Sequence, residues 1–521
     1  MVNRFLFGVR SQILCTVIFV GVLAAGMLRT QAQAPAVPAS SSAPLANETI
    51  AIDGNAASHP FPHFWEQMFG SGRAILSLRQ DYRDDLRAVK RITGFQYVRF
   101  HAIFDDDVGL YNQAADGGLD LNFSYVDQIY DGLVANGVRP FVELSFMPKQ
   151  LTSNPEAIQA FWYKPNVAPP KDYAKWDAMI HAFARHLIDR YGEDEVAKWY
   201  FEVWNEPNID FWAGVPKQQT YFILYDHTAR ALKAVSPRIR VGGPATAQAA
   251  WVDQFIQHVT SNNVPVDFIS THVYGNDSAK DVFGTNENIP RTQMVCRAVK
   301  KVHDQIIASA APKLPLIWSE YNASYKNEED VTDAPFMGPW LADTIRQCDG
   351  MTQMMSYWTF SDVFEEQGVV KKPFYGGFGL LAEGGVPKPA FNAFALLHRL
   401  GGRRLDVRSD SALVTKRSDG SLAIAVWNLF LPEEKGSAKK VTLRFSNVHG
   451  ATHAQVWIID ANHGSPLPAY SAMGSPAFPS PKQFEALRKA AELPAPKSEI
   501  LTGSTLTLTL QPQALALIEL R

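Results

Sequence analysis

Motifs that mark several large protein classes are missing from this chain of 521 residues. No segment reads GxGxxG or GxxxxGK[ST] after a strand-like run, which argues against a nucleotide-binding sheet. Only three cysteines occur, without the CxxC spacing of zinc or redox sites. The net charge is −3, so the chain lacks the basic surface that binds nucleic acid or an anionic membrane.

Long apolar runs are also missing after the first 34 residues, so no later segment is predicted to cross a membrane. Arg4 and Arg10 precede an apolar run at 13–28, and Ala32-Gln33-Ala34 fits a signal-peptidase site. Residues 1–34 therefore predict a secretory signal and an exported protein, periplasmic or extracellular. Because Pro35 disfavours cleavage, an uncleaved anchor is the alternative. Residues 35–47 form a Pro/Ala/Ser linker.

Two cysteines follow the signal, Cys296 and Cys348, and each lies on a predicted helix. Two cysteines do not make a disulfide scaffold. In an oxidising compartment they can pair, and as buried residues they can equally remain free thiols. The sequence leaves both states open.

Short apolar runs alternate with amphipathic stretches between residues 60 and 400. Hydrophobic residues make up 46% of the chain and charged residues 19%, which is typical of a globular protein. The predicted strands are 66–72, 95–101, 139–146, 199–206, 239–245, 268–275, 315–322 and 354–362. Eight buried strands separated by helices predict an α/β fold, a (β/α)8 TIM barrel, over 60–400.

The pattern changes after residue 400. Strand-like runs now follow one another closely, Asp419-Gly420 marks a hairpin turn, and Leu506, Leu508 and Leu510 alternate with polar residues. Residues 401–521 are therefore predicted to form a C-terminal antiparallel β-sandwich, interrupted by one helix near 481–492. The strand-like segment within 48–59 is expected to join this sandwich from the other end of the chain.

Polar residues at the carboxyl ends of the predicted barrel strands are the candidates for function, because barrel active sites lie there. The fourth strand ends in Asn205-Glu206 and the seventh in Glu320. Glycoside hydrolysis needs such a pair, one protonated carboxyl for the leaving oxygen and one ionised carboxylate. Pro207 stops the fourth strand after Glu206, and the Asn205 amide can donate to a sugar 2-hydroxyl.

Each of these signals has a simpler explanation when taken alone. A single glutamate at a strand end is more often a solvated loop residue, and a single histidine such as His272 is often a core residue. Asp105, Asp106 and Asp107 after His101 suggest a metal site, but three consecutive acids are more often a solvated loop or a helix cap. The combination of Asn-Glu-Pro on one strand and Trp-Ser-Glu-Tyr on another favours the glycosidase interpretation.

Many segments of the chain resemble glycoside hydrolase family 39, the β-xylosidase and α-L-iduronidase family of clan A retaining glycosidases. WNEPN (204–208) and IWSEY (317–321) are similar to the acid/base and nucleophile motifs of that clan. The further similar segments are FWEQMFGSGRA (64–74), RFHAIFDDD (99–107), GGPAT (242–246), STHVYG (270–275), YWTFSDVFEEQG (357–368), PFYGGFGLL (373–381), PKPAFNAF (387–394) and AMGSPAFPSPKQFEALRKAAE (472–492). The resemblance extends over about 48–521.

The resemblance implies Glu206 as general acid/base and Glu320 as nucleophile in a double displacement. The residues it implies for sugar binding are His101, Asn205, His272, Tyr274, Trp358 and one of Glu365 and Glu366, with Phe64 and Phe146 as apolar wall. It implies no cofactor, no metal and no nucleic acid. The expected substrate is a carbohydrate, with exo-β-D-xylosidase action on xylo-oligosaccharides favoured. Other β-glycosidase, α-L-iduronidase or endo specificity, transglycosylation and non-catalytic sugar binding are the alternatives, and the oligomeric state stays open.

Overall fold

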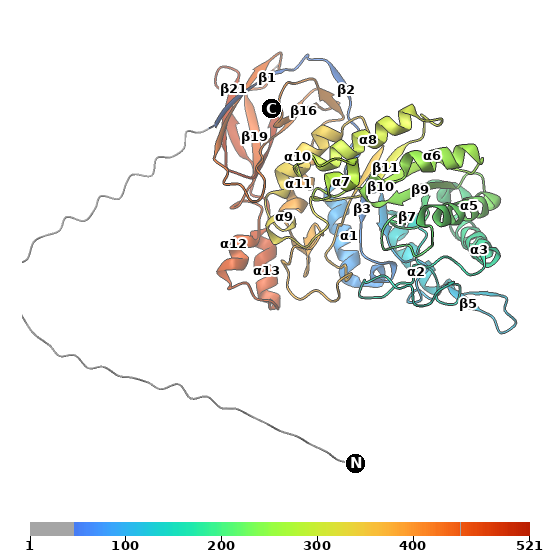
Figure 1. Cartoon of the computed structure of the whole chain (residues 1–521). Helices are drawn as coiled ribbons and strands as arrows, with labels where there is room; N and C mark the ends of the chain where they lie inside the picture. Colours follow the sequence, from blue (N-terminus) through green and yellow to red (C-terminus); the bar gives the residue numbers. More distant parts are fainter. Residues whose placement is uncertain (1–45, 449) are drawn as a thin grey trace, which may run out of the picture. The chain divides into compact units, whose positions relative to one another are not determined.

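The computed structural model of the chain describes residues 46–448 and 450–521 (Figure 1). The predicted secretory signal and most of the Pro/Ala/Ser linker lie outside the described residues. Within the described ranges, none of the helices has the length and apolar character needed to span a bilayer.

Eight parallel strands form a closed barrel, which confirms the predicted fold. In barrel order they are β3 (Met68–Gly70), β4 (Tyr97–Phe100), β7 (Arg139–Glu143), β8 (Tyr200–Glu202), β9 (Arg240–Thr246), β10 (Phe268–His272), β11 (Leu316–Tyr321) and β12 (Met354–Tyr357). These strands are buried almost throughout, because side chains fill the barrel and helices cover its outside.

Helices connect the strands and cover the barrel. The longer ones are α1 (Gln80–Ile92), α2 (Ser124–Ala135), α3 (Tyr173–Tyr191), α5 (Lys217–Val235), α6 (Val252–Ser261), α8 (Met294–Ala308), α10 (Met337–Cys348) and α11 (Pro389–Leu397). The shorter elements are η1 (Ala74–Leu78), α4 (Glu193–Val196), η2 (Ala247–Ala249), α7 (Ala279–Phe283), α9 (Glu329–Thr332) and the strand pairs β5 (Tyr111–Gln113) with β6 (Leu119–Leu121) and β13 (Leu381–Ala382) with β14 (Val386–Pro387). Local sequence sets their ends: Asp172 caps the start of α3 with its side chain, and Gly192, at a φ of 84°, ends it.

The sandwich consists of two sheets that face each other, and each sheet combines a strand from the start of the described chain with strands from its end. The first sheet has the order β1 (Ala46–Asp53), β18 (Lys439–Ser446), β21 (Thr505–Leu510). The second has the order β2 (Ser58–Pro60), β15 (Arg403–Leu405), β16 (Ala412–Lys416), β17 (Leu422–Asn428), β22 (Ala514–Leu520), β19 (His453–Ile459), β20 (Lys497–Ile500). The helices α12 (Leu467–Ala472) and α13 (Pro481–Ala490) are inserted between β19 and β20. The β1–β18 pair is parallel, a departure from the antiparallel pattern expected from the sequence.

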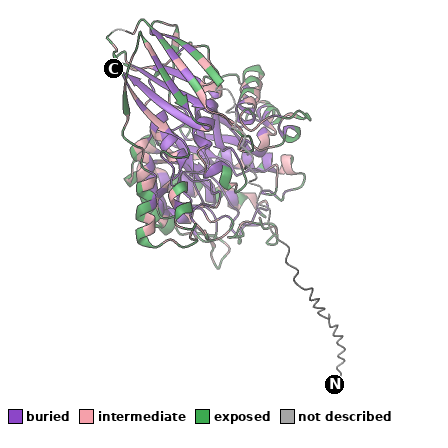
Figure 2. Cartoon of the chain, turned by 90° about the vertical axis from the view of Figure 1, so that its left-hand side faces the viewer, coloured by how far each residue is buried: buried purple, intermediate pink, exposed green. Residues whose placement is uncertain are grey.

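The second sheet of the sandwich is buried on both faces, which explains why its central strands read as continuous apolar runs. Along β17, Ile424 belongs to the core between the two sheets, whereas Ala425 and Trp427 belong to the core shared with the barrel. Helix α10 of the barrel contacts β17 and β22, and helix α11 contacts β22 and β19. The outer strand β21 alternates between buried and exposed residues, as the colours of Figure 2 show for the outer strands of the sandwich. The sandwich is therefore packed against the barrel through a shared apolar layer.

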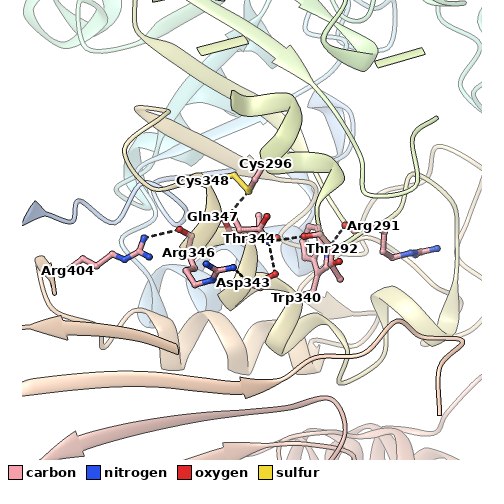
Figure 3. The surroundings of a disulfide bond; sticks show 10 residues. All are labelled: Arg291, Thr292, Cys296, Trp340, Asp343, Thr344, Arg346, Gln347, Cys348 and Arg404. Atoms are coloured by element: carbon pink, nitrogen blue, oxygen red, sulfur yellow. Dashed lines mark hydrogen bonds and ion pairs between the residues drawn. A yellow bond between two sulfur atoms is a disulfide. The ribbon is translucent and has the colours of Figure 1, made fainter. Parts of the chain in front are cut away.

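A disulfide joins Cys296 of α8 to Cys348 at the end of α10 (Figure 3). The structure therefore answers the question that the sequence left open. Both cysteines are buried, and 52 residues separate them. Near the bond, Arg346 binds Asp343 within α10, and its backbone oxygen accepts a hydrogen bond from Arg404 of β15. The disulfide thus lies on the side of the barrel that faces the sandwich.

Candidate active site

A cavity of about 380 Å³ opens at the carboxyl ends of the barrel strands. Four of its lining residues carry carboxyl groups, and most of the others are aromatic or amide side chains. The lining residues are His101, Gln159, Phe161, Asn205, Glu206, Ile209, Phe211, Ala247, Gln248, Tyr274, Asp277, Glu320, Tyr325, Trp358, Glu366, Gln367 and Phe378. Most of the site residues predicted from the sequence are thus brought together here.

Glu206 enters this cavity from the turn that follows β8. The backbone there is unusual, because Trp204 and Glu206 have positive φ angles of 73° and 43°. Such conformations cost on the order of 1–3 kcal/mol each and persist only where surrounding contacts impose them. Here the Glu206 backbone N–H donates to the oxygen of Ala245, 2.7 Å away, and the residue is 9% exposed. The sharp turn places the carboxyl at the mouth of a rigid sheet.

Glu320 lies in β11, on the other side of the cavity, and both of its oxygens accept short hydrogen bonds. Arg99 Nη1 donates to Oε1 at 2.5 Å, and the Tyr274 hydroxyl donates to Oε2 at 2.5 Å. A carboxylate held by a guanidinium and a phenol O–H is stabilised in its ionised form. The contacts therefore suit Glu320 to remain charged.

The two carboxylates are close and lie in different electrostatic surroundings. An oxygen of each lies within 4.8 Å of the other and of a His272 nitrogen. Burial, followed by the charge of Glu320 and then that of Asp277, holds the pKa of Glu206 well above its usual range. Burial also raises the pKa of Glu320, but Arg99 counteracts that effect. Because Arg99 binds Glu320 directly, we infer that Glu206 holds the proton of the pair.

Arg99, in β4, organises the floor of the cavity and was not among the residues predicted from the sequence. Its side chain is completely buried. Arg99 Nε donates to Glu202 at 2.6 Å, and its Nη2 lies 2.7 Å from Glu143. Burial lowers the pKa of Arg99, but the charges of the surrounding glutamates outweigh burial and raise it. An arginine inside the apolar run FQYVRFH was the available signal, since a buried charge needs partners.

Arg99 also orients the amide of Asn205. Arg99 Nη2 donates to Asn205 Oδ1 at 2.9 Å, so the amide NH₂ is the group left to face the cavity. His101 is oriented in the same way, because its Nδ1 lies 2.7 Å from Glu143 and its Nε2 points toward Glu366. The ring of Trp358 packs against His101 with centroids 4.8 Å apart. The three side chains form a fixed polar and aromatic wall.

Glu365 and Glu366 point in different directions, which answers the question of which one faces the cavity. Glu366 is buried, lines the cavity and lies 3.5 Å from His101 Nε2. Burial, followed by the charges of Glu320 and Glu206, raises its pKa well above the usual range. Glu365 instead accepts a hydrogen bond of 2.5 Å from Arg79, outside the cavity.

Two phenylalanines expected as apolar wall do not line the cavity. Phe64 precedes β3, and its oxygen accepts a hydrogen bond from Met355 near the start of β12, at the amino-terminal end of the barrel. The expectation for Phe64 is therefore wrong, because a residue before a barrel strand lies at the end opposite to the active site. Phe146 lies behind the wall, with its ring stacked on Phe211 and 6.0 Å from the centroid of His101.

Two groups of side chains in the described part of the chain have ligand atoms close enough to hold one metal ion. One consists of Glu206, His272 and Glu320, and the other of His63, Glu66 and His398 near the barrel's amino-terminal end. In the second group, both imidazole Nδ1 atoms lie 2.7 and 2.9 Å from Glu66 Oε1, distances typical of hydrogen bonds. The hydrogen bonds of both groups account for their geometry.

Comparison with known families supplies a match over most of the chain. The sequence model of Glycosyl hydrolases family 39 matches residues 48–505. A β-xylosidase of Geobacillus stearothermophilus is 39% identical over 440 residues, covering 82% of this chain and 86% of that protein. An α-L-iduronidase of Canis lupus familiaris is 25% identical over 453 residues, covering 77% of this chain and 66% of that protein.

A solved structure has the same architecture. The crystal structure of a monomeric β-xylosidase from Caulobacter crescentus CB15 superposes with a TM-score of 0.82 at 35% identity. The alignment covers 91% of this chain and 99% of that one. The similarity therefore includes both the barrel and the sandwich.

Proposed function

The chain belongs to glycosyl hydrolases family 39 and is a glycoside hydrolase, and from this we propose that it is an exported, exo-acting β-D-xylosidase that retains anomeric configuration. Its substrates are xylo-oligosaccharides. The identity of 39% with a β-xylosidase supports the sugar, and the signal pattern at residues 1–34 supports export.

The choice of a neutral sugar rests on which charged side chains line the cavity. Of its lining residues, Glu206, Asp277, Glu320 and Glu366 carry carboxyl groups, and none is lysine or arginine. An iduronide brings its own carboxylate, which needs a cationic or backbone donor. The lining residues offer no cationic side chain to pair with that carboxylate, whereas a neutral xyloside needs no such partner.

The distance between the two carboxylates supports retention. Oxygens within 4.8 Å fit the ~5 Å typical of retaining enzymes and are closer than the ~6.5–9.5 Å at which inverting enzymes admit a water. In the proposed reaction, Glu206 protonates the leaving oxygen while Glu320 attacks the anomeric carbon. Glu206 then removes a proton from the water that hydrolyses the glycosyl-enzyme.

The other cavity residues have matching roles. Tyr274 donates a hydrogen bond to one oxygen of Glu320 and thereby orients the carboxylate that acts as the nucleophile. In this proposal the Asn205 amide donates to the sugar 2-hydroxyl, an interaction that strengthens in the transition state. The cavity volume of about 380 Å³ is near the small end of ligand sites, which suits the end of a sugar chain more than its interior.

A panel of chromogenic glycosides tests this proposal with wild type and Glu320→Ala in parallel. The panel contains β-xyloside, β-glucoside, β-galactoside, α-arabinoside and α-iduronide. We expect the β-xyloside to be cleaved best and Glu320→Ala to be inactive on all five. Preferential cleavage of the iduronide would refute the sugar assignment, and intact xylosides with cleaved polymeric xylan would refute exo action. Proton NMR of the first product tests retention, because an initial α-anomer would contradict it.

A further inference from the structure

Ser319 lies in β11 directly before Glu320, and its side chain is fully buried. Its hydroxyl oxygen has two polar neighbours on different strands. Glu202 Oε1 of β8 lies 2.6 Å away, and His272 Nε2 at the end of β10 lies 3.0 Å away. The other ring nitrogen, His272 Nδ1, lies 3.0 Å from Glu206 Oε1. A continuous hydrogen-bonded chain therefore joins Glu202 to Glu206.

Which atom donates in each of these hydrogen bonds follows from the state of Glu202. Arg99 Nε donates to Glu202 Oε2 at 2.6 Å, so Glu202 is the acceptor in an ion pair. The single hydroxyl hydrogen of Ser319 must therefore point to Glu202. The lone pairs of the Ser319 oxygen remain for His272, so Nε2 carries a hydrogen and donates it.

The position of the hydrogen on the His272 ring determines the protonation of Glu206. Burial, followed by the charges of Arg99 and His101, lowers the pKa of His272 well below its usual range, so the ring is neutral. A neutral imidazole has one N–H, which leaves Nδ1 as an acceptor. Its neighbour Glu206 Oε1 must then carry a proton, because two acceptors at 3.0 Å repel each other.

We propose that Ser319 is a positioning residue that fixes the Nε2–H tautomer of His272 and thereby keeps Glu206 protonated in the resting enzyme. This inference rests on the proposed function, because it assigns to Ser319 the preparation of the general acid. After the leaving group departs, the Nδ1 lone pair of this tautomer repels the ionised carboxylate of Glu206. The repulsion favours removal of a proton from the attacking water by Glu206.

The other charges around these groups stay in place when Ser319 is replaced. Glu206 faces the carboxyl groups of Glu320, Asp277 and Glu143 and the guanidinium of Arg99. His272 faces Arg99 and His101, with Glu320 Oε1 3.6 Å from Nδ1. A shift caused by Ser319→Ala can therefore be ascribed to the tautomer.

The first test is the pH dependence of kcat/KM for an aryl β-xyloside with wild type, Ser319→Ala, Ser319→Thr and Ser356→Ala. Without the hydroxyl, His272 can adopt the Nδ1–H tautomer and donate to ionised Glu206. We expect the alkaline limb of Ser319→Ala to move to lower pH by about one unit, a roughly tenfold loss on that limb. Threonine keeps the hydroxyl and should restore the wild-type limb.

Ser356 of β12 is the matched control. It is fully buried in the barrel wall, and its hydroxyl has no hydrogen-bond partner among the described residues. Ser356→Ala should leave the alkaline limb unchanged. An equal shift in Ser356→Ala, or an unshifted limb in Ser319→Ala, would overturn the inference.

A second test needs no turnover. In protein labelled with ¹⁵N-histidine, the one-bond N–H coupling reports which nitrogen of His272 carries hydrogen, and His272→Gln identifies its signals among the 13 histidines. We expect Nε2–H in wild type and Nδ1–H in Ser319→Ala. Nδ1–H in wild type would refute the inference even if the xyloside is cleaved. Failure to cleave any panel glycoside, with the Nε2–H tautomer present, would refute only the proposed function.

Discussion

The barrel interior and the core between the two sandwich sheets are both shielded from water, but they are filled differently. The barrel strands bury Arg99, Glu143, Glu202, His272 and Glu320. Among the described sandwich strands, Glu519 is the buried charged residue, and its carboxylate is bound by arginines at the junction with the barrel. The core between the sheets is a cluster of aliphatic side chains and one phenylalanine.

This difference indicates that the barrel interior is arranged for chemistry and that the core of the sandwich is arranged for stability. Buried ion networks add little stability relative to apolar packing, but removal of one partner leaves an uncompensated charge. The buried charges of the barrel therefore carry a cost that orients Glu206 and Glu320, whereas the core between the two sandwich sheets contributes apolar burial. Substitutions in the two regions should consequently separate activity from stability.

The largest effect is expected from Glu206→Ala in the barrel. Loss of a general acid should lower kcat/KM for xylobiose by about 10²–10⁴-fold, because the leaving sugar needs a proton. Aryl xylosides with very acidic leaving groups should lose far less in the glycosylation step. Added azide should restore turnover of those substrates by intercepting the glycosyl-enzyme. Wild-type rates on xylobiose would rule out the assigned role.

Arg99→Met should remove both activity and stability, because Glu143, Glu202 and Glu320 would be left buried without their cation. We expect a loss of about 3–5 kcal/mol in the free energy of unfolding, measured by urea titration at pH 7. Arg399→Met is the matched control at the junction with the sandwich. It should cost about 1 kcal/mol or less, since Arg417 still binds Glu519 at 2.7 Å. Equal losses of stability in the two variants would contradict the difference drawn between the barrel interior and the junction with the sandwich.

Replacement of both cysteines, Cys296→Ala with Cys348→Ala, should affect stability alone. The disulfide closes a loop across 52 residues, so its removal should lower the free energy of unfolding by about 2–4 kcal/mol. Neither cysteine lines the cavity, so kcat/KM at 25 °C should match wild type. A changed kcat/KM in the folded variant would show that the junction influences the site.

The smallest effect is expected from Ile424→Val in the sandwich core. Removal of one buried methyl group should cost about 0.5–1.5 kcal/mol, measured by thermal or urea unfolding. The kcat/KM of the folded enzyme should stay within the error of the wild-type value. A twofold or larger change in kcat/KM would contradict the separation of roles between the two regions.

Sequence patterns predicted the architecture well because the patterns are local. A parallel strand buried on both faces must be apolar along its length, so the eight barrel strands were visible as eight runs. Strand ends could be located in the same way, which is why Glu206 and Glu320 could be placed at one mouth. The parallel pairing of β1 with β18 could not be predicted, because strand direction depends on partners nearly 400 residues away.

The parts of the site that the sequence did not predict depend on contacts between distant residues. Arg99 and Glu320 are 221 positions apart, and no local pattern reports that they meet. Glu365 and Glu366 are adjacent, so only the path of the loop decides which one faces the cavity. Phe64 belongs to a segment similar to the family but lies before its strand, at the opposite end of the barrel.

The sequence by itself determined that this chain forms a barrel with a sandwich and that two glutamates lie at or just beyond the carboxyl-terminal part of barrel strands. Periodic burial and strand ends are properties of neighbouring residues, so the order of residues is sufficient to reveal them. Tertiary structure sets the electrostatic difference between the two glutamates, because a pKa depends on burial and on charges brought from other strands. The Arg99 contacts, made between side chains far apart in the chain, distinguish Glu320 from Glu206.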